Sequence, residues 1–328
     1  MLATGRLTGL MKLRYRFSYQ VKPVSPYCFR LTVKKPAGWP LFTPFEIYEN
    51  ETLWSALHLD DELVGVKIQS LGQTDRPLLR VEVFTKRRAT TAIKEAIKES
   101  LNDLQGVNDD LSPFYTFARN DPILKHVIED LHGMHDTFSN SLFARATLAI
   151  LLQMTSIKRA NQMMNCVITR YGQTAEFDGK RIRVWPTHQQ LSKITATQLA
   201  KTCKLGYRAK SLAKLARVMT KNGGPTLTEL KELTREDAKR QLMELPGIGD
   251  YSADIINRPS GFPIDVWSAA VFGKLFYGKE PENNREAVDR VKADGIRRWG
   301  EWSWMAFFYV VQDLEKLSRK LNTTLRLQ

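Results

Sequence analysis

The sequence predicts an α+β fold in which an N-terminal antiparallel sheet precedes a helical part. Two observations carry this prediction. Between residues 13 and 84, short runs rich in β-branched and aromatic residues alternate with turn residues. After Asp109, the apolar residues recur at helical spacing almost throughout. A chain of 328 residues is long enough for two or three domains with cores of their own.

Six runs make up the expected sheet region. They are YRFSYQV at residues 15–21, YCFRLTV at 27–33, FEIYEN at 45–50, ETLWSALHL at 51–59, LVGVKIQSL at 63–71 and LLRVEVF at 78–84. Residues 90–104 follow with an amphipathic pattern, which predicts a helix packed on one face of the sheet.

The domain organisation follows from this order of elements. We expect residues 1–12 to be a flexible basic extension, 13–108 to form the α+β domain and 109–328 to form an all-α core. Within the core, loops are expected at residues 178–187 and 221–226. Two helical lobes with a cleft between them are the expected arrangement.

Charge and hydropathy restrict the class of partner. The formal net charge is +14, and the apolar runs at residues 148–152 and 305–311 are far too short to span a bilayer. A strongly basic chain favours a polyanionic partner, although charge alone does not distinguish nucleic acid from other anionic surfaces. A soluble protein of the cytoplasm is expected.

Cysteine and histidine usage predicts no metal or disulfide chemistry. Cys28, Cys166 and Cys203 lie far apart and form no CxxC motif, which favours reduced thiols and excludes a four-cysteine iron–sulfur cluster. The five histidines include His132 and His135, whose positions around a glycine favour surface or capping roles over metal binding. No cofactor is expected.

The most informative motif is LPGIGDYSA at residues 245–253. Residues 235–244 predict a helix capped by Thr234, with Ala238, Leu242 and Met243 on one face. Glycines at the following turn allow positive φ and a close approach of the backbone to a phosphate. The motif therefore predicts a helix, a hairpin and a second helix.

The residues of the hairpin have separate expected roles. Gly247 and Gly249 leave the backbone bare, and Ile248 plugs the turn into the core. Asp250 is expected to cap the second helix, whose first N–H groups suit an anion. Taken alone, such a glycine turn is also typical of ordinary helical bundles.

A carboxylate follows the hairpin in the loop at residues 261–267, which contains the run PIDVW. When a base leaves deoxyribose, positive charge develops on the sugar, and a fixed carboxylate stabilises it and orients a water. Asp265 is the candidate for this role. The alternative is a simple helix N-cap, because residues 266–276 form a good helical run.

Residues 245–267 resemble the core signature of the helix-hairpin-helix DNA glycosylase superfamily, which has LPGxGxxxA, a helix, and an aspartate after a short loop containing proline. Three further stretches are similar to its AlkA-like branch, the 3-methyladenine DNA glycosylases II. They are DDLSPFYTF at residues 109–117, ILLQMTSIKRAN at 150–161 and LGYRAKSL at 205–212. The resemblance covers about residues 104–314 and implies base excision repair of alkylated purines in duplex DNA.

The resemblance also implies roles for single residues in the base pocket. Bifunctional relatives place a nucleophilic lysine where this chain has Tyr251, which predicts a monofunctional enzyme that uses water. Tyr251 and Trp302 match aromatic walls against which a cationic base stacks. Trp267, Trp299 and Trp304 are alternatives, for which core packing is the simpler role.

Base flipping requires a residue that fills the gap in the duplex. The similarity places Met154 at this wedge position on a helix, with Gln153 facing the pocket or the orphan base, although core packing suits a methionine equally well. The predicted backbone contacts are the N–H groups of the hairpin and nearby cations. They are Gly247, Ile248, Gly249, Arg208, Lys210 and Lys158, with Arg159 in support. In this family the hairpin carbonyls can hold a structural monovalent cation.

Two other functions stay open. One is a glycosylase for hypoxanthine or 8-oxoguanine. Tyr251 argues against the 8-oxoguanine enzymes that depend on a lysine at this position. The other is a non-catalytic helix-hairpin-helix module that binds damaged or branched DNA. We expect a monomer without a required cofactor, associated with the nucleoid of a prokaryotic or archaeal cell.

Overall fold

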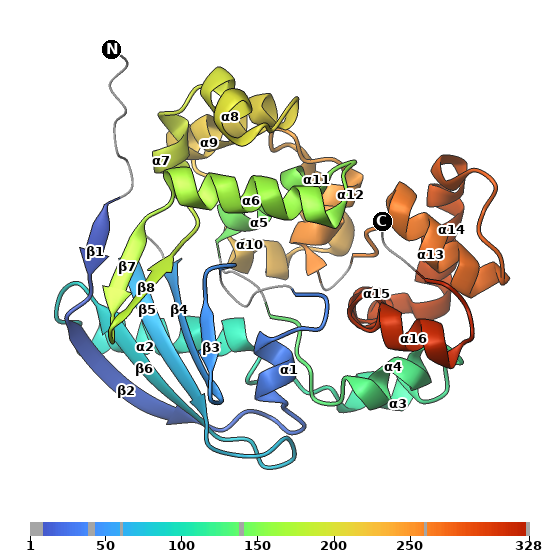
Figure 1. Ribbon diagram of the computed structural model, residues 1–328, viewed down its shortest axis with the longest axis horizontal. Coiled ribbons are helices and arrows are strands. Elements are labelled where there is room, and N and C mark those ends of the chain that lie inside the picture. The colour runs from blue at the N-terminus through green and yellow to red at the C-terminus, as the bar shows by residue number, and fades with distance from the viewer. Residues whose placement is uncertain (1–8, 39–42, 60–61, 138–140, 259–260, 326–328) are drawn as a thin grey trace. The chain divides into compact units, whose positions relative to one another are not determined.

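The computed structural model describes residues 9–38, 43–59, 62–137, 141–258 and 261–325 (Figure 1). Its contacts divide the chain into two units. The sheet unit comprises residues 1–111, 133–144 and 163–223, and the hairpin unit comprises 112–132, 145–162 and 224–328. Each unit is made of three separate segments of the chain. The expected domains at 13–108 and 109–328 are each one continuous segment, and their limits stay a prediction.

The sheet unit is built on a five-stranded antiparallel sheet of order β2-β6-β5-β4-β3, which confirms the predicted α+β class (Figure 1). Its strands are β2 (Tyr15–Val21), β3 (Ile47–Glu49), β4 (Thr52–Leu59), β5 (Glu62–Ser70) and β6 (Leu79–Thr85). The helix α2 (Thr91–Gln105) begins at Thr90, whose hydroxyl accepts from the Ile93 N–H. Leu53, Val66 and Val81 form a common core with Ile97 and Leu101 of α2.

The opposite face of the sheet is covered by three short strands that the sequence did not predict. They are β1 (Leu10–Lys12), β7 (Thr174–Phe177) and β8 (Lys180–Arg183), with β7 in the middle. Phe177 packs so closely on Gly65 that a Cβ at residue 65 would lie 2.6 Å from its ring. The glycine is therefore required for the contact between the two sheets.

Three predictions for this unit are wrong. Residues 27–33 were expected as a strand but contain the helix α1 (Phe29–Val33), because Phe29, Thr32 and Val33 are buried at helical spacing. The β8 strand lies in the expected loop 178–187, and β1 lies in the expected flexible extension. Pairing with β7 orders both strands, while residues 1–8 lie outside the described part.

Besides α1 and α2, the sheet unit contains α7 (His188–Ser192), α8 (Ala196–Cys203), α9 (Arg208–Asn222) and most of α6 (Ile157–Tyr171). The structure joins Cys166 of α6 to Cys203 of α8 in a disulfide. The expectation of reduced thiols is therefore wrong for this pair, because the fold brings together two residues that are 37 apart in sequence. Closing a loop of this length stabilises a fold by about 4 kcal/mol on the chain-entropy estimate.

His135 is a core residue rather than the expected surface or capping residue. Its side chain is fully buried, and its Nε2 lies 3.1 Å from the Pro26 carbonyl oxygen. Burial lowers the pKa of His135 to about 4, against smaller opposing effects of Pro26 and Asp136, so the ring is neutral at physiological pH. His132 is exposed and stacks on Tyr115 with ring centroids 5.4 Å apart.

The hairpin unit is built from helices. They are α3 (Ser112–Ala118), α4 (Leu124–Asp130), most of α5 (Leu142–Leu152), α10 (Leu227–Glu232), α11 (Arg235–Met243), α12 (Asp250–Ile256), α13 (Val266–Tyr277), α14 (Asn284–Trp299), α15 (Ser303–Gln312) and α16 (Leu314–Lys320). Phe262, Phe272, Trp299 and Phe307 form an aromatic core with centroid separations of 5.2 to 6.0 Å. The loop between α9 and α10 agrees with the one expected at 221–226. No helix in the described part of the chain has both the length and the apolarity to cross a membrane.

Two carboxyl groups, the half-buried Asp130 and the buried Asp313, lie between α4 and the start of α16. Lys320 and Lys316 reach the Asp130 carboxylate at 2.7 and 3.4 Å, while Asp313 is only 3 % exposed. Burial opposes ionisation of Asp130, but the two lysines outweigh it and keep its pKa below the ordinary value. Burial and the charge of Asp130 raise the pKa of Asp313 to about 7.

This pair predicts a pH dependence of stability. A carboxyl group whose pKa is raised by folding contributes stability that is fully present below its unfolded pKa and is lost as the pH rises through its folded pKa. Between pH 4 and pH 7 we expect the wild type to lose on the order of 2 kcal/mol of unfolding free energy relative to Asp313→Asn. Urea denaturation at a series of pH values measures this difference, with Asp289→Asn on the exposed face of α14 as control. Parallel curves for the wild type and Asp313→Asn would contradict the prediction.

Candidate active site

The predicted helix-hairpin-helix is present between α11 and α12. Thr234 caps α11 and accepts from the Asp237 N–H at 3.2 Å, as predicted. Gly247 has a φ of +82°, so the turn requires the left-handed region that glycine adopts without strain. Ile248 is 6 % exposed and anchors the turn in the core, but its N–H donates to the Leu245 carbonyl at 3.1 Å. The amide of Ile248 is thus used inside the turn rather than presented to a phosphate.

The backbone conformation at Gly249, unlike that at Gly247, does not require glycine. Its φ of −112° is open to any residue, and a Cβ built on it would meet nothing within 4 Å. Gly249 is the N-cap of α12 and offers no side chain to cap the first turn. The fold itself does not need glycine at residue 249, and the predicted contact of this residue with a phosphate stays a prediction.

Two of the expectations around the hairpin are wrong. Asp250 does not cap α12 but occupies its first position, and its carboxylate pairs with Lys239 and Lys292. Met243, expected on the buried face of α11, is 46 % exposed, and Ala238 and Leu242 form that face. The helix ends at Met243, so its side chain lies at the rim of the hairpin.

A network of two lysines and two aspartates holds the three helices around the hairpin. The nearly buried carboxylate of Asp254 on α12 lies 3.2 Å from Lys239 of α11 and 2.5 Å from Lys292 of α14. Asp250 joins both lysines from the first turn of α12. Burial opposes the charges, but hydrogen bonds within the network outweigh it and lower the pKa of Asp250 while raising the pKa of Lys292.

Sequence reasoning missed this network. Lys292 lies 42 and 38 residues from its two partners, so no local pattern indicates the contact. The i,i+4 spacing of Asp250 and Asp254 was the available signal, because it places both carboxylates on one face of α12.

Gln153 reaches the hairpin from the end of α5. Its side-chain amide donates to the Gly247 carbonyl at 2.7 Å and to the Ser252 hydroxyl at 2.8 Å. Gln153 therefore positions the hairpin and the first turn of α12. Its predicted contact with the base or the orphan base stays a prediction.

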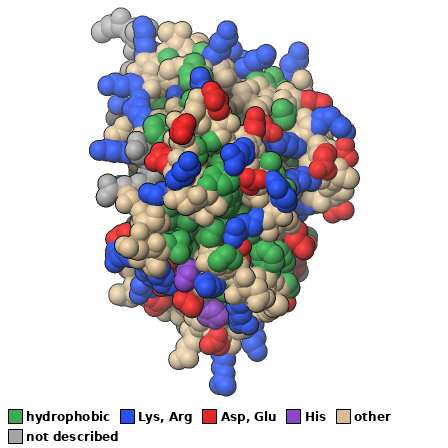
Figure 2. Space-filling view, turned by 90° about the vertical axis from the view of Figure 1, so that its right-hand side faces the viewer, with side chains coloured by type: hydrophobic (Ala, Val, Ile, Leu, Met, Phe, Trp, Pro, Cys, Tyr) green, Lys and Arg blue, Asp and Glu red, His purple; other side chains and the backbone are tan. Residues whose placement is uncertain are grey.

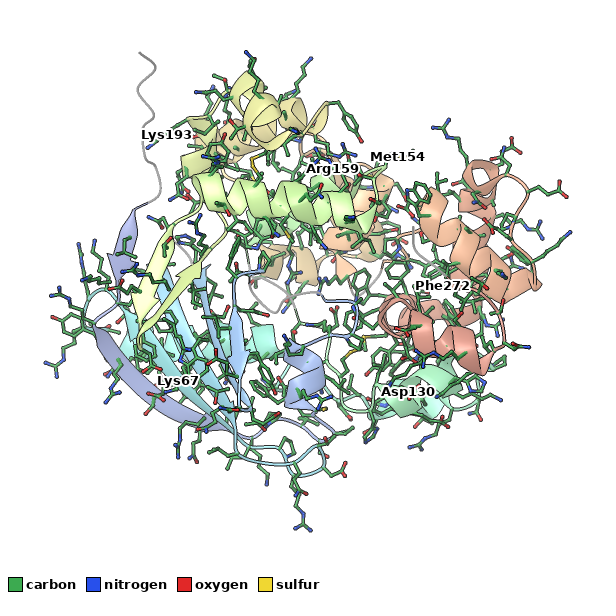
Figure 3. The ribbon with its side chains drawn as sticks, in the orientation of Figure 1. Lys67, Asp130, Met154, Arg159, Lys193 and Phe272 are labelled. Carbon is green, nitrogen blue, oxygen red and sulfur yellow. A yellow bond between two sulfur atoms is a disulfide. The ribbon has the colours of Figure 1, made fainter. Side chains whose placement is uncertain are left out.

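Met154 lies in the turn between α5 and α6, not on a helix as expected (Figure 3). Its side chain is 56 % exposed, so the alternative of core packing is wrong. Its φ of +46° is unusual for a residue with a side chain and costs on the order of 1 kcal/mol. Met154 is thus an exposed apolar side chain on a strained turn, and its role as a wedge stays a prediction.

Asp265 has the helix-cap role that the sequence left as one alternative, while its catalytic role stays a prediction. It is the N-cap of α13, and its Oδ1 accepts from the Trp267 N–H at 3.1 Å and from the Ser268 N–H and hydroxyl at 2.8 Å each. Within the described part of the chain, Oδ2 accepts no hydrogen bond, and the residue is only half-buried. The cap fixes the carboxylate through one oxygen and leaves the other available.

Tyr251 shares the environment of Asp265. It is half-buried on the first turn of α12, and its pKa is raised first by burial and then by the negative charge of Asp265. A neutral phenol ring therefore lies within electrostatic range of the candidate catalytic carboxylate. No amine occupies this position.

The four candidate tryptophans separate into two core residues and two half-buried ones, of which Trp267 lies in the first turn of α13. Trp302 is half-buried and packs on Phe114 with ring centroids 5.7 Å apart. Trp299 donates to Asp121 from the core, and Trp304 is 3 % exposed under the Arg258 guanidinium. The simpler role of core packing is confirmed for Trp299 and Trp304.

The predicted cations differ in exposure. Lys158 at the start of α6 and Lys210 on α9 are exposed, and Arg159 donates to Gln162 at 3.2 Å. Arg208 is 8 % exposed, with its guanidinium 4.6 Å from the centroid of the Tyr207 ring. Burial makes Arg208 a poorer phosphate ligand than Lys210.

Tyr207 is a candidate that the sequence analysis did not single out. Its ring is 59 % exposed, and exposed aromatic rings provide stacking surfaces for unpaired bases. Its place between Gly206 and a cation in GYRAK was the available signal.

No group of three histidine, cysteine, aspartate or glutamate side chains could hold a metal ion among the residues that the structure describes. The carbonyls of Leu245 and Gly247 already accept from Ile248 and Gln153. Each carbonyl retains a second lone pair, so the expected monovalent cation stays a prediction.

Comparison with known proteins identifies the family of this region. The model of the HhH-GPD superfamily base excision DNA repair protein matches residues 147–293, which contain the hairpin and Asp265. A DNA-3-methyladenine glycosylase of Bacillus subtilis is 23% identical over 66% of this chain and 72% of its own length. A probable N-glycosylase/DNA lyase of Methanothermobacter thermautotrophicus is 21% identical over 63% of this chain and 72% of its own length.

Solved structures share the fold of the whole chain. A 3-methyladenine DNA-glycosylase from Archaeoglobus fulgidus aligns with a TM-score of 0.72 and 20% identity, over 92% of this chain and 99% of its own. The apo form of an 8-oxoguanine glycosylase/lyase from Clostridium acetobutylicum aligns with a TM-score of 0.67 and 19% identity, over 92% and 99%. The resemblance seen in the sequence is confirmed: residues 147–293 match the HhH-GPD family model, and the chain shares its fold with these solved structures.

Proposed function

We propose that the protein is a monofunctional DNA glycosylase that removes alkylated purines of the 3-methyladenine type from duplex DNA. The observation that carries the proposal is the capped carboxylate of Asp265, together with an aromatic residue at position 251. The carboxylate of Asp265 is fixed by the α13 cap, and Tyr251, whose phenol is within electrostatic range of it, is an aromatic residue in place of the lysine of bifunctional relatives. The similarity to the Bacillus subtilis DNA-3-methyladenine glycosylase supports it.

The proposed reaction is hydrolysis of the N-glycosidic bond. The bond breaks with its electron pair going to the base, and positive charge develops on the deoxyribose. The Asp265 carboxylate stabilises this charge, and its Oδ2 accepts a proton from the water whose oxygen bonds to the anomeric carbon. A cationic alkylated base is a good leaving group, so one carboxylate suffices.

Tyr251 supports recognition of such a base. The face of its ring attracts a cationic purine by about 0.5 to 2 kcal/mol, depending on desolvation. Trp302 is the proposed second wall. Because residue 251 carries no amine and the Lys274 ammonium donates to the Thr324 carbonyl at 3.1 Å, no strand cleavage by β-elimination is expected.

The proposal includes flipping of the damaged nucleotide. Met154 is the proposed wedge, because it is the exposed apolar side chain on the strained turn before α6. Gln153 holds the hairpin from the same turn, so insertion of Met154 and the grip on the backbone are mechanically linked. The hydrogen bond from the Gln153 amide to the hairpin is compatible with its proposed position beside the base pocket.

The proposed grip on the DNA backbone comes from the bare amide of Gly249, with Gly247 shaping the turn. Lys158 and Lys210 are exposed cations for phosphates, whereas Arg208 and the Ile248 amide are already engaged within the fold. The proposed partner is double-stranded DNA with damaged bases, bound by a monomer associated with the nucleoid in a prokaryotic or archaeal cytoplasm.

Excision of 8-oxoguanine or hypoxanthine is the second candidate. The fold also resembles that of an 8-oxoguanine glycosylase/lyase, with a TM-score of 0.67 against 0.72 for the 3-methyladenine enzyme, and one relative is named as a probable N-glycosylase/DNA lyase. Tyr251 argues against the lysine-dependent reaction. A non-catalytic module would not need a half-buried carboxylate with one uncommitted oxygen.

The substitution Asp265→Asn tests the catalytic role without removing the cap. Asparagine caps helices about as well as aspartate, so the variant loses the charge and keeps the α13 N-terminus. We expect single-turnover release of 3-methyladenine from methylated duplex to fall by roughly 100-fold or more, with duplex binding and Tm unchanged. Asp289→Asn, on the exposed face of α14, is the matched control. A rate equal to wild type would remove Asp265 from the mechanism, and no release by wild type from any damaged duplex would favour the binding module.

The two hairpin glycines give a paired prediction. Gly249→Ala meets no atom and no forbidden φ, so its Tm should match wild type while its affinity for duplex DNA falls about tenfold through loss of close approach. Gly247→Ala places a Cβ at a φ of +82° and should lower stability by about 1 kcal/mol. Fluorescence anisotropy and thermal unfolding of both variants separate the two effects. Wild-type affinity in Gly249→Ala would show that the bare backbone is not used.

A further inference from the structure

The pairing of β2 with β6 brings two basic segments of the sheet unit together. Tyr15 at the start of β2 pairs with Thr85 at the end of β6. Lys12, Arg14 and Arg16 lie at this end of β2, and Lys86, Arg87 and Arg88 continue from β6. We call these six residues, all of them exposed, the basic corner.

Acidic partners neutralise only part of the basic corner. Arg16 lies 3.8 Å from Glu82, and Lys12 lies 3.6 Å from Glu176. Arg14, Lys86, Arg87 and Arg88 form no ion pair with any residue that the structure describes. Four cations at one end of a sheet therefore keep their full charge.

A groove extends the basic corner across the second sheet. Its volume is about 690 Å³, and its walls include Lys12, Arg14, Lys180 and Arg181. The acids on it are already engaged: Glu176 lies 2.7 Å from Arg181, and Asp178 accepts from the Trp54 indole N–H at 2.7 Å. Ion pairs also engage Lys12, Arg181 and Lys180, so among the described residues Arg14 is the groove cation that stays unpaired and joins the groove to the rest of the basic corner.

Folding does not account for these charges. Leu13, 4 % exposed, anchors the corner between β1 and β2, while the cations beside it reach into solvent. Like charges held close together repel each other and lower the stability of the folded state. In Figure 2, by contrast, Lys and Arg side chains are interspersed with Asp and Glu over the visible face.

We propose that the basic corner and its groove bind the phosphate backbone of duplex DNA, as a contact separate from the hairpin. This inference rests on the proposed function, because a glycosylase binds duplex DNA while it searches for damage. Regularly spaced phosphates match a row of exposed cations without requiring any base to be recognised. The sheet unit thereby contributes affinity, and the hairpin unit contributes the chemistry.

The test compares two double variants of the full chain. Arg87→Gln/Arg88→Gln removes two unpaired cations of the corner, where the backbone carbonyl of Arg87, not its side chain, accepts from Thr85. Lys94→Gln/Lys98→Gln removes two cations from the adjacent helix α2, where both ammonium groups lie over aromatic rings of β2. Binding to an undamaged duplex is measured by fluorescence anisotropy between about 50 and 200 mM NaCl, a range in which phosphate contacts have a large effect.

The proposal predicts a change in salt dependence for the corner variant alone. Each phosphate contact contributes about 0.9 to the slope of log affinity against log salt, so Arg87→Gln/Arg88→Gln should reduce the slope by about 1.8 and weaken binding about tenfold. The slope of Lys94→Gln/Lys98→Gln should equal that of wild type. Equal slopes for all three proteins, or an equal reduction in both variants, would overturn the proposal.

Two further measurements separate this proposal from other partners and from the proposed function. Loss of binding to vesicles containing phosphatidylserine or to duplex RNA, with DNA binding unchanged, would overturn it in favour of another polyanion. Base release at saturating enzyme should be equal in the corner variant and the wild type. If neither protein releases any base, the glycosylase proposal fails, while the salt slopes still decide whether the corner binds DNA.

Discussion

The placement of the hairpin depends on a charge network across three helices. Lys239 of α11 and Lys292 of α14 both pair with Asp250 and Asp254 of α12. Asp254 is almost fully buried, and removing one partner of a buried pair typically costs 3 to 5 kcal/mol because the other charge stays uncompensated. The network thereby fixes the first turn of α12, which carries Tyr251, and the glycine turn before it.

The candidate catalytic carboxylate is held by a different device. The N-terminus of α13 supplies two N–H groups and a serine hydroxyl to one oxygen of Asp265. A charge that is oriented before the reaction stabilises a developing cation without reorganisation at the moment of bond cleavage. Capping and catalysis are therefore compatible uses of the same aspartate, because each requires only one of its two oxygens.

Local patterns predicted the elements that depend on local chemistry. The strands at residues 15–21 and 78–84, the helix after Thr90 and the glycine turn at Gly247 were all found from alternation, capping and turn residues. Features that depend on distant contacts were missed. Burial turned residues 29–33 into a helix, pairing made a strand of β8, and the fold brought Cys166 to Cys203. For the site, the motif predicted both Asp265 and Tyr251. The hydrogen bond from Gln153 to the hairpin joins residues that are distant in sequence, so only the structure shows it.

Release of base by the wild-type protein from three duplexes, each with one lesion, tests the central claim most directly. The duplexes carry 3-methyladenine, hypoxanthine or 8-oxoguanine, and the products are resolved with and without alkali. We expect 3-methyladenine to be released at least about tenfold faster than the other two bases, because Tyr251 favours a cationic base. The strand should be cut only after alkali, because Tyr251 supplies no amine. Preferred release of 8-oxoguanine with a strand cut in the absence of alkali would contradict it.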